Sequence, residues 1–257
     1  MKSLSKFSVR SCDELCDITA LAEVQGLENA RVEECKKVAK GPGLWPSKLK
    51  SLSLENTSLK EIGSCPAALA EISIRQNPKL LTLKGLTSCK DIEISSWGLD
   101  LSGCFSLKNL DGLSVKNLEE ILIPETLSNL DALAAYPNVK ITVVAGNGKE
   151  KGYTSVVDDI PEAIGMALAK IKVTELNVRT EWGSELKKIT GIGLATTLTS
   201  LDLSGCNLAD ITAIAPLENL EMLKVQPRTE LSKKLGKATF DSKGQIDKLR
   251  LKLLAGI

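Results

Sequence analysis

The sequence contains no histidine, and only 3% of its 257 residues are aromatic. Without histidine, the usual general base, the Ser–His and Cys–His nucleophile pairs and the commonest transition-metal ligand are missing. This excludes most hydrolase mechanisms. We therefore expect a protein that is not an enzyme, with no catalytic residue and no cofactor.

The sequence also has no excess of charge of one sign and no long hydrophobic run. Lys and Arg number 33 against 32 for Asp and Glu, so we expect no strong attraction to nucleic acid. No run approaches the roughly 18 apolar residues of a membrane span, and the first residues lack the apolar stretch of a secretory signal. These features predict an intracellular, cytoplasmic protein with no membrane partner.

The seven cysteines are too scattered to form a disulfide framework. Thiolate-bound zinc would require paired C-x-x-C motifs, whereas three residues separate Cys12 from Cys16. We interpret most cysteines as reduced, buried small hydrophobes and expect no metal site.

An internal repeat organises the chain. The clearest unit starts at Leu198 and has the spacing L-x-x-L-x-L-x-x-C-x-L-x-x-I-x-x-I-x-x-L. The opening segment repeats it with Leu4, Phe7, Val9 and Cys12. Further units begin at Leu27, Leu49, Leu69 and Cys89, so consecutive starts lie 20 to 23 residues apart. A fixed period indicates that each unit buries its apolar side against the next.

This pattern resembles the leucine-rich repeat, most closely the short-repeat type of the protein phosphatase 1 regulatory-subunit class. The resemblance implies an α/β solenoid with short parallel strands on a concave wall, which is the usual binding face of the family. Independently, the x-L-x-L alternation places the leucines on one side of a strand. The Asn, Cys or Thr after each strand is suited to bond backbone groups of the neighbouring turn. These residues are Cys12, Cys35, Thr57, Asn77 and Cys206.

Two stretches depart from the period. Between Cys89 and the unit at Leu118, a strand at Leu110–Val115 competes with one at Ile121–Ile123. Residues 158–168 have helical apolar spacing, and Asp241 or Ser242 can start a second helix at the C-terminus. We predict one domain over 1–257, with repeats at 4–145, a loop and helix insertion at 146–170, repeats at 171–227 and a helical cap at 228–257.

Two glycine-containing loops are the only candidates for ligand chemistry. Gly146 follows an apparent strand and precedes a helix, but the Walker spacing is absent. The segment from Gly191 lacks the third glycine of a dinucleotide fingerprint. We interpret both as turns.

Outward strand positions on the predicted concave face are the candidate partner-binding residues, and acidic residues dominate them. They are Glu55, Glu71, Arg75, Asp91, Glu93, Glu120, Glu175, Asn177, Arg179, Trp182 and Asp202. Trp182 follows the strand that carries Asn177 and Arg179, whereas Trp45 and Trp97 fit core or loop packing. An ordinary solvated sheet face accounts for the pattern equally well.

We hypothesise that this face binds a partner protein with a basic or mixed-charge segment, making the chain a scaffold or a regulatory or assembly subunit. Two alternatives stay open. One is a ligand-binding or enzymatic protein that uses the Gly146 and Gly191 loops. The other is a host-directed effector.

Overall fold

The computed structural model describes residues 4–89, 92–94, 98–146, 156–180 and 185–255. The fold is α/β, with mainly parallel strands and few helices. Two compact units form: unit 1 comprises Met1–Leu122 and Ala132–Val139, and unit 2 comprises Ile123–Asp131 and Lys140–Ile257. Within the described residues, no helix is long and apolar enough to cross a membrane.

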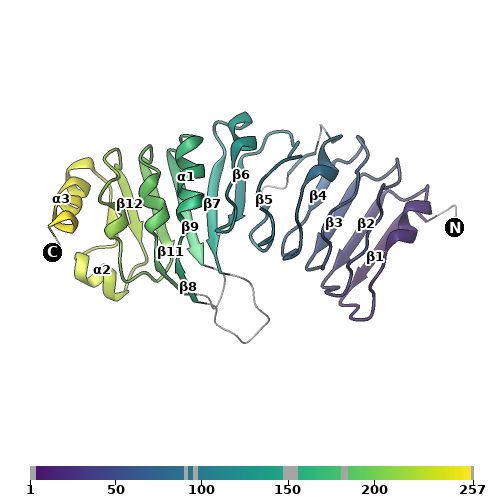
Figure 1. Ribbon diagram of the computed structural model, residues 1–257, viewed down its shortest axis with the longest axis horizontal. Helices are drawn as coiled ribbons and strands as arrows, with labels where there is room; N and C mark the ends of the chain where they lie inside the picture. The colour runs from purple at the N-terminus through teal and green to yellow at the C-terminus, as the bar shows by residue number, and fades with distance from the viewer. Residues whose placement is uncertain (1–3, 90–91, 95–97, 147–155, 181–184, 256–257) are drawn as a thin grey trace. The chain divides into compact units, whose positions relative to one another are not determined.

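Unit 1 is built on a parallel four-stranded sheet in the order β1-β2-β3-β4 (Figure 1). Its strands are β1 (Lys6–Arg10), β2 (Asn29–Glu33), β3 (Ser51–Glu55) and β4 (Glu71–Ser73). The register stacks repeat-equivalent residues, as in the row Val9, Val32 and Leu54. The strands lie where the repeat predicts, because stacked apolar residues bury one another.

Short 3-10 turns form part of the return between some of the strands. They are η1 (Thr19–Glu23) and η2 (Lys84–Leu86), with η3 (Asp131–Ala135) later in the chain. Left-handed residues follow the strand segments at Ser11, Glu34, Asn56 and Gln76, with φ of 52°, 55°, 50° and 58°. The first three direct their N–H groups to carbonyls of the next strand segment, so the costly backbone conformation is matched by hydrogen bonds.

The residues after the strands bond neighbouring backbone, as predicted. Asn77 Nδ2 donates to the Leu54 carbonyl at 2.6 Å and to the Ile74 carbonyl at 2.7 Å. Asn77 Oδ1 accepts from the Thr57 amide at 3.0 Å and from the Thr57 hydroxyl at 2.6 Å. Cys206 Sγ donates similarly to the Val178 carbonyl at 3.1 Å. These buried side chains satisfy backbone groups that water cannot reach.

The break in the period after Cys89 has a structural counterpart. The expected strand at Ile92–Ile94 is reduced to bridges from Glu93 to Glu71 and to Lys116. A short strand that the sequence did not predict, β5 (Leu99–Asp100), pairs with β6 (Glu120–Pro124). The competing strand at Leu110–Val115 does not form; β6 is the strand. Cys104 takes the position after β5, and its Sγ donates to the Ile74 carbonyl at 3.4 Å.

Unit 2 contains parallel strands paired in the order β7-β9-β11-β12. Their bounds are β7 (Lys140–Ala145), β9 (Glu175–Thr180), β11 (Ser200–Gly205) and β12 (Met222–Val225). A separate parallel pair consists of β8 (Val156–Asp159) and β10 (Glu185–Lys188). The return segments include η4 (Thr190–Leu194) and η5 (Thr212–Ile214).

Both predicted helices are present in unit 2. The insertion forms α1 (Glu162–Lys170), which buries Ile164 and Leu168, although β8 before it was not predicted. The C-terminal helix α3 (Lys243–Leu254) begins after Ser242, buries Ile246 and Leu249, and contacts η5 and β12.

The sequence did not predict α2 (Glu230–Leu235), which starts with a capping box between Thr229 and Ser232. It also did not predict β13 (Thr239–Phe240), which pairs antiparallel with β12. Together with α3, these elements cover the β12 end of unit 2 (Figure 1).

Candidate functional site

The side of the four-stranded sheet that points away from the core of unit 1 is the best-defined candidate surface. We call it the outer face of unit 1. It consists of Lys6, Ser8, Arg10, Asn29, Arg31, Glu33, Ser51, Ser53, Glu55, Glu71, Ser73, Arg75 and Glu93. These residues alternate with apolar residues that face the core, because successive side chains of a strand point to opposite faces.

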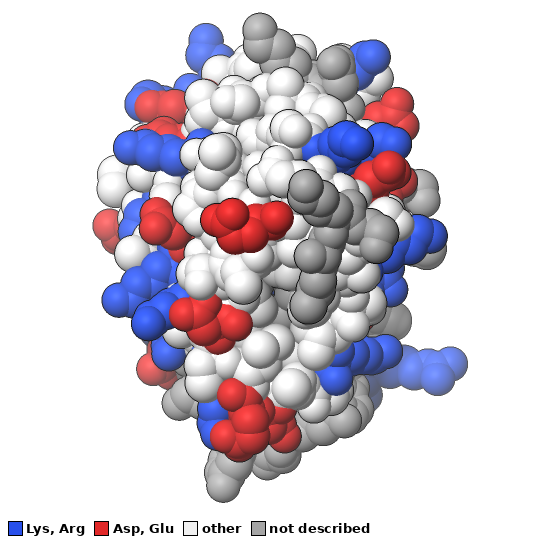
Figure 2. Space-filling view, turned by 90° about the vertical axis from the view of Figure 1, so that its right-hand side faces the viewer, with Lys and Arg blue, Asp and Glu red and all other residues white. Residues whose placement is uncertain are grey.

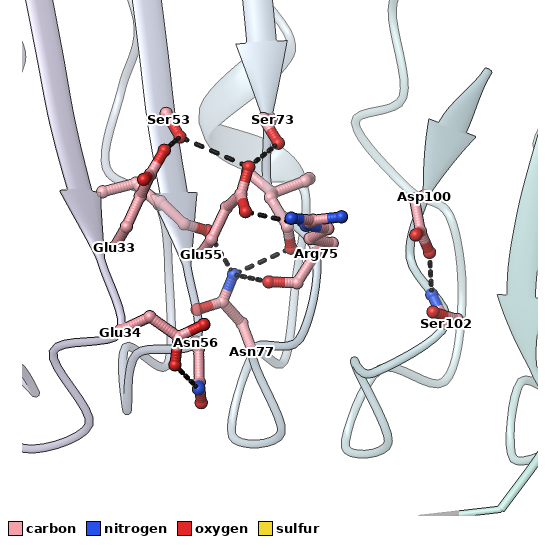
Figure 3. Close-up of polar contacts among 12 residues, drawn as sticks. Glu33, Glu34, Ser53, Glu55, Asn56, Ser73, Arg75, Asn77, Asp100 and Ser102 are labelled. Atoms are coloured by element: carbon pink, nitrogen blue, oxygen red, sulfur yellow. Dashed lines mark hydrogen bonds and ion pairs between the residues drawn. The ribbon is translucent and has the colours of Figure 1, made fainter. Parts of the chain in front are cut away.

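Glu55 is the centre of a hydrogen-bonded cluster on this face (Figure 3). Ser73 Oγ donates to Glu55 Oε1 at 2.6 Å, and Arg75 Nε donates to Glu55 Oε2 at 2.7 Å. Ser53 Oγ donates to Glu33 Oε1 at 3.2 Å and lies 3.5 Å from Glu55 Oε1. The side chain of Glu55 is only 16% exposed, so its carboxylate is held in a defined position.

The serines of this face therefore have a role that the sequence did not reveal. Ser53 and Ser73 bond carboxylates across adjacent strands, which their small size and outward strand positions do not indicate. Arg31 Nε adds an ion pair to Glu33 Oε1 at 3.2 Å. Glu33 and Glu55 are thus neutralised by arginines within the same unit, so this part of the face is of mixed charge rather than acidic.

The environment of Glu55 shifts its ionisation. Partial burial alone would raise the pKa of Glu55, but the hydrogen bonds from Ser73 and Arg75 and the Arg75 charge outweigh it. The pKa of Glu55 therefore lies below its ordinary value of 4.5. A carboxylate with a lowered folded-state pKa stabilises the fold above its unfolded-state pKa, and this stabilisation is lost as the pH falls through the folded value.

We accordingly expect Glu55→Gln to make the free energy of unfolding less dependent on pH in the acidic range. The free energy of unfolding of wild type should exceed that of the variant at about pH 6, and the difference should shrink towards about pH 3. Urea denaturation at several pH values measures this. Glu61→Gln, at an exposed glutamate outside the cluster, is the control. A difference independent of pH would contradict the assigned role of the Glu55 carboxylate.

Two other predicted acidic residues, Glu71 and Glu93, lie beside each other on this face. Glu71 and Glu93 are exposed and face each other across an isolated bridge, and Lys116 is the bridge partner on the far side of Glu93. Among the described residues, neither glutamate forms an ion pair. Adjacent like charges disfavour each other, so a cation brought to this point would be attracted. Glu120 is half-buried at the start of β6.

The remaining predicted residues lie in unit 2 or outside the described residues. Asn177 stands in register between Thr142 and Asp202. Asp202 forms an ion pair with Lys224 at 3.4 Å and accepts the Ser204 amide at 2.9 Å. Glu175 and Arg179 point outward on β9. Asp91 and Trp182 lie outside the described residues, as does Trp97.

Trp45 is buried, as predicted. Its side chain is part of the core, and its Nε1 donates to the Ile62 carbonyl at 2.7 Å. A buried indole with its one donor satisfied is a packing residue, so Trp45 is not available to a partner.

The amide of Gly191 is bonded within the fold and is not free to hold a ligand. Gly191 is buried in η4, and its amide donates to the Ile160 carbonyl at 3.0 Å. A Cβ at Gly191 would lie 2.2 Å from the Pro161 carbonyl oxygen, so the glycine permits close backbone packing. Gly146 follows β7 with φ of 117°, and residues 147–149 lie outside the described residues.

A depression of about 210 Å³ lies beside α1 in unit 2, and neither glycine loop lines it. Asp131 and Lys170 line it and form an ion pair at 2.6 Å. In the described part of the chain, no cluster of Cys, Asp or Glu residues is arranged to hold a metal ion. Neither the models of known protein families nor curated protein sequences match this chain.

Proposed function

We propose that the chain is a leucine-rich-repeat solenoid that acts as a non-catalytic protein-binding scaffold or regulatory subunit. The support is the agreement between a sequence period of 20 to 23 residues and parallel strands stacked in register. In solenoids of this kind, equivalent outward side chains of successive strands line up in long exposed rows. Partner proteins commonly bind to that surface.

The outer face of unit 1 is the proposed binding surface, and one observation carries the proposal. Exposed Glu71 and Glu93 stand together and form no ion pair with any described residue, next to a cluster around Glu55 that is already fixed by hydrogen bonds. A fixed surface loses little conformational freedom on binding, and unneutralised carboxylates attract a basic group. The partner we propose is a protein segment with Lys or Arg facing Glu71 and Glu93.

The test is affinity capture from an extract of the cells that make the protein, comparing wild type with Glu71→Lys/Glu93→Lys. We expect recovery of one specific protein to fall about ten-fold, because two attractive contacts become repulsive. Purified wild type should also bind that protein more weakly at about 300 mM salt than at about 50 mM.

Glu23→Lys/Glu61→Lys is the matched control. It makes the same change of charge at two exposed residues of unit 1 that lie outside the outer face. Circular dichroism and thermal melting establish that all three proteins fold. Equal recovery by wild type and Glu71→Lys/Glu93→Lys, or an equal loss in the control, would contradict binding at this surface.

A further inference from the structure

The first repeat of unit 1 leaves its apolar positions partly open. Leu4, Phe7, Val9, Cys12 and Leu15 are all partly exposed. Their counterparts in the second repeat are buried: Leu27, Val32, Cys35 and Val38 at 0% exposure and Ala30 at 2%. Figure 2, which looks onto the molecule from the β1 side, shows a surface whose middle is largely uncharged, with acidic groups scattered over it.

The backbone of β1 is also open on one side. On the paired side, the Ser5 carbonyl accepts from the Asn29 amide at 3.0 Å, and the Ser11 amide donates to the Glu33 carbonyl at 2.9 Å. Bonds in a parallel ladder alternate along the strand, so the intervening odd-numbered residues also face β2. The N–H and C=O groups of Lys6, Ser8 and Arg10 therefore point away from β2. Among the described residues, none of these groups has a backbone partner.

The side chains along this edge are basic. Lys6 and Arg10 are exposed, and within the described chain neither forms an ion pair. On the paired side, Arg10 is in register with Glu33 of β2, so opposite charges already stand across one edge of β1. A second strand with carboxylates at the equivalent positions would repeat that arrangement on the free edge.

A second copy of β1 does not fit this edge. Antiparallel self-pairing centred on Ser8 would place Lys6 of each copy opposite Arg10 of the other, which sets like charges against each other twice. Basic residues on an edge strand are a known means of opposing such self-association. The free edge thus disfavours pairing with a second copy of β1 and favours pairing with an acidic strand.

We propose that β1 is a docking edge for an extended segment of a partner protein, in which Asp or Glu residues alternate with apolar residues. The segment adds a strand beside β1, its backbone bonds Lys6, Ser8 and Arg10, and its apolar residues cover Phe7 and Val9. Its carboxylates face Lys6 and Arg10. This mode of recognition takes affinity from the main chain and specificity from alternate side chains. It uses Lys6 and Arg10 at the β1 end of the outer face of unit 1 rather than Glu71 and Glu93, and it does not depend on binding at those two glutamates.

The probe is a fluorescein-labelled peptide of eight residues in which glutamate alternates with valine. A second peptide carries lysine in place of glutamate, and a third is the glutamate peptide with every second amide N-methylated. By fluorescence anisotropy, we expect the glutamate peptide to bind at least about ten-fold more tightly than either of the others. Lys6→Glu/Arg10→Glu should reverse the preference, so that the lysine peptide binds more tightly.

Hydrogen exchange read by NMR locates the contact. On adding the glutamate peptide, exchange should slow at the amides of Lys6, Ser8 and Arg10, whereas Phe7 and Val9 already face β2 and should change little. Lys48→Glu/Lys60→Glu, with the same charge change at exposed lysines elsewhere in unit 1, should bind like wild type.

Three results would overturn the proposal. The first is equal or absent binding of the glutamate and lysine peptides. The second is unchanged binding of the N-methylated peptide, which would exclude main-chain pairing. The third is a stable dimer of wild type in sedimentation equilibrium with these three amides already protected, which would make a second copy the occupant.

Discussion

Gly165→Ala is expected to lower the free energy of unfolding by about 3 kcal/mol. Gly165 lies inside α1, where the helix crosses η4. A Cβ at this position would lie 1.7 Å from the carbonyl oxygen of Gly191. The obstacle is backbone rather than a flexible side chain, so α1 and η4 would have to separate and lose buried contacts around Ile164 and Leu168. Urea denaturation followed by circular dichroism measures the loss.

A second glycine in a helix supplies the control. Gly244 lies in the first turn of α3, and a Cβ there would meet no atom within 4 Å. Because alanine is the better helix former, Gly244→Ala should leave stability unchanged or raise it by up to about 1 kcal/mol. If Gly165→Ala proved as harmless as Gly244→Ala, the close approach of α1 to η4 would be wrong.

Asn77→Ala should cost about 3 kcal/mol, because it removes one buried amide that bonds four backbone groups. The carbonyls of Leu54 and Ile74 would lose a donor, and the Thr57 amide would lose its acceptor. Groups left unpaired away from water carry their full desolvation penalty. The measurement is the shift of the urea midpoint at an unchanged slope.

Asn77→Cys separates hydrogen bonding from packing. Cys104 and Cys206 occupy equivalent positions, and each donates from Sγ to a strand carbonyl. We therefore expect Asn77→Cys to recover part of the loss. Asn109→Ala, which removes a single bond from the Asp111 amide in a partly exposed turn, should cost only about 0.5 kcal/mol. Equal losses in Asn77→Ala and Asn109→Ala would show that the buried amide bonds are unimportant.

The parts of the fold that follow a period could be predicted from sequence. Strands β1 to β4 lie on the repeat, and the roles of Thr57 and Asn77 follow from their positions after strands. Helix α1 was predicted from apolar spacing of the helical period. In each case, the signal is a local pattern that burial on one side imposes.

What escaped prediction lacks such a pattern. Strand β5 is only two residues long, and extra chain between Ile92 and Cys104 interrupts the period before it. Helix α2 covers six residues, too few for apolar spacing to stand out. These elements form because neighbouring chain completes their hydrogen bonds, which single-sequence patterns do not record.

The candidate site was predicted at the level of single positions but not of interactions. Alternation places Glu55, Glu71 and Glu93 on one face, and the structure agrees. Their charges looked alike in sequence, yet Glu55 is bonded by Ser73 and Arg75, whereas Glu71 and Glu93 form no ion pair in the part of the chain that the structure describes. The distinction depends on which strand positions stand in register, and that is a property of the sheet.

The one-sided pairing of β1 has a consequence for how unit 1 opens. Each strand of its sheet is held only by its immediate neighbours, so unfolding of the stack is expected to proceed as fraying from the end where, among the described residues, a strand is paired on one side only. That end is the first repeat, and its amides should exchange with solvent earliest. Because Ser53 connects Glu33 to Glu55, loss of β1 and then β2 would release the Glu55 cluster stepwise. The stability of the Glu55 cluster on the outer face of unit 1 thus depends on how firmly β1 is held against β2.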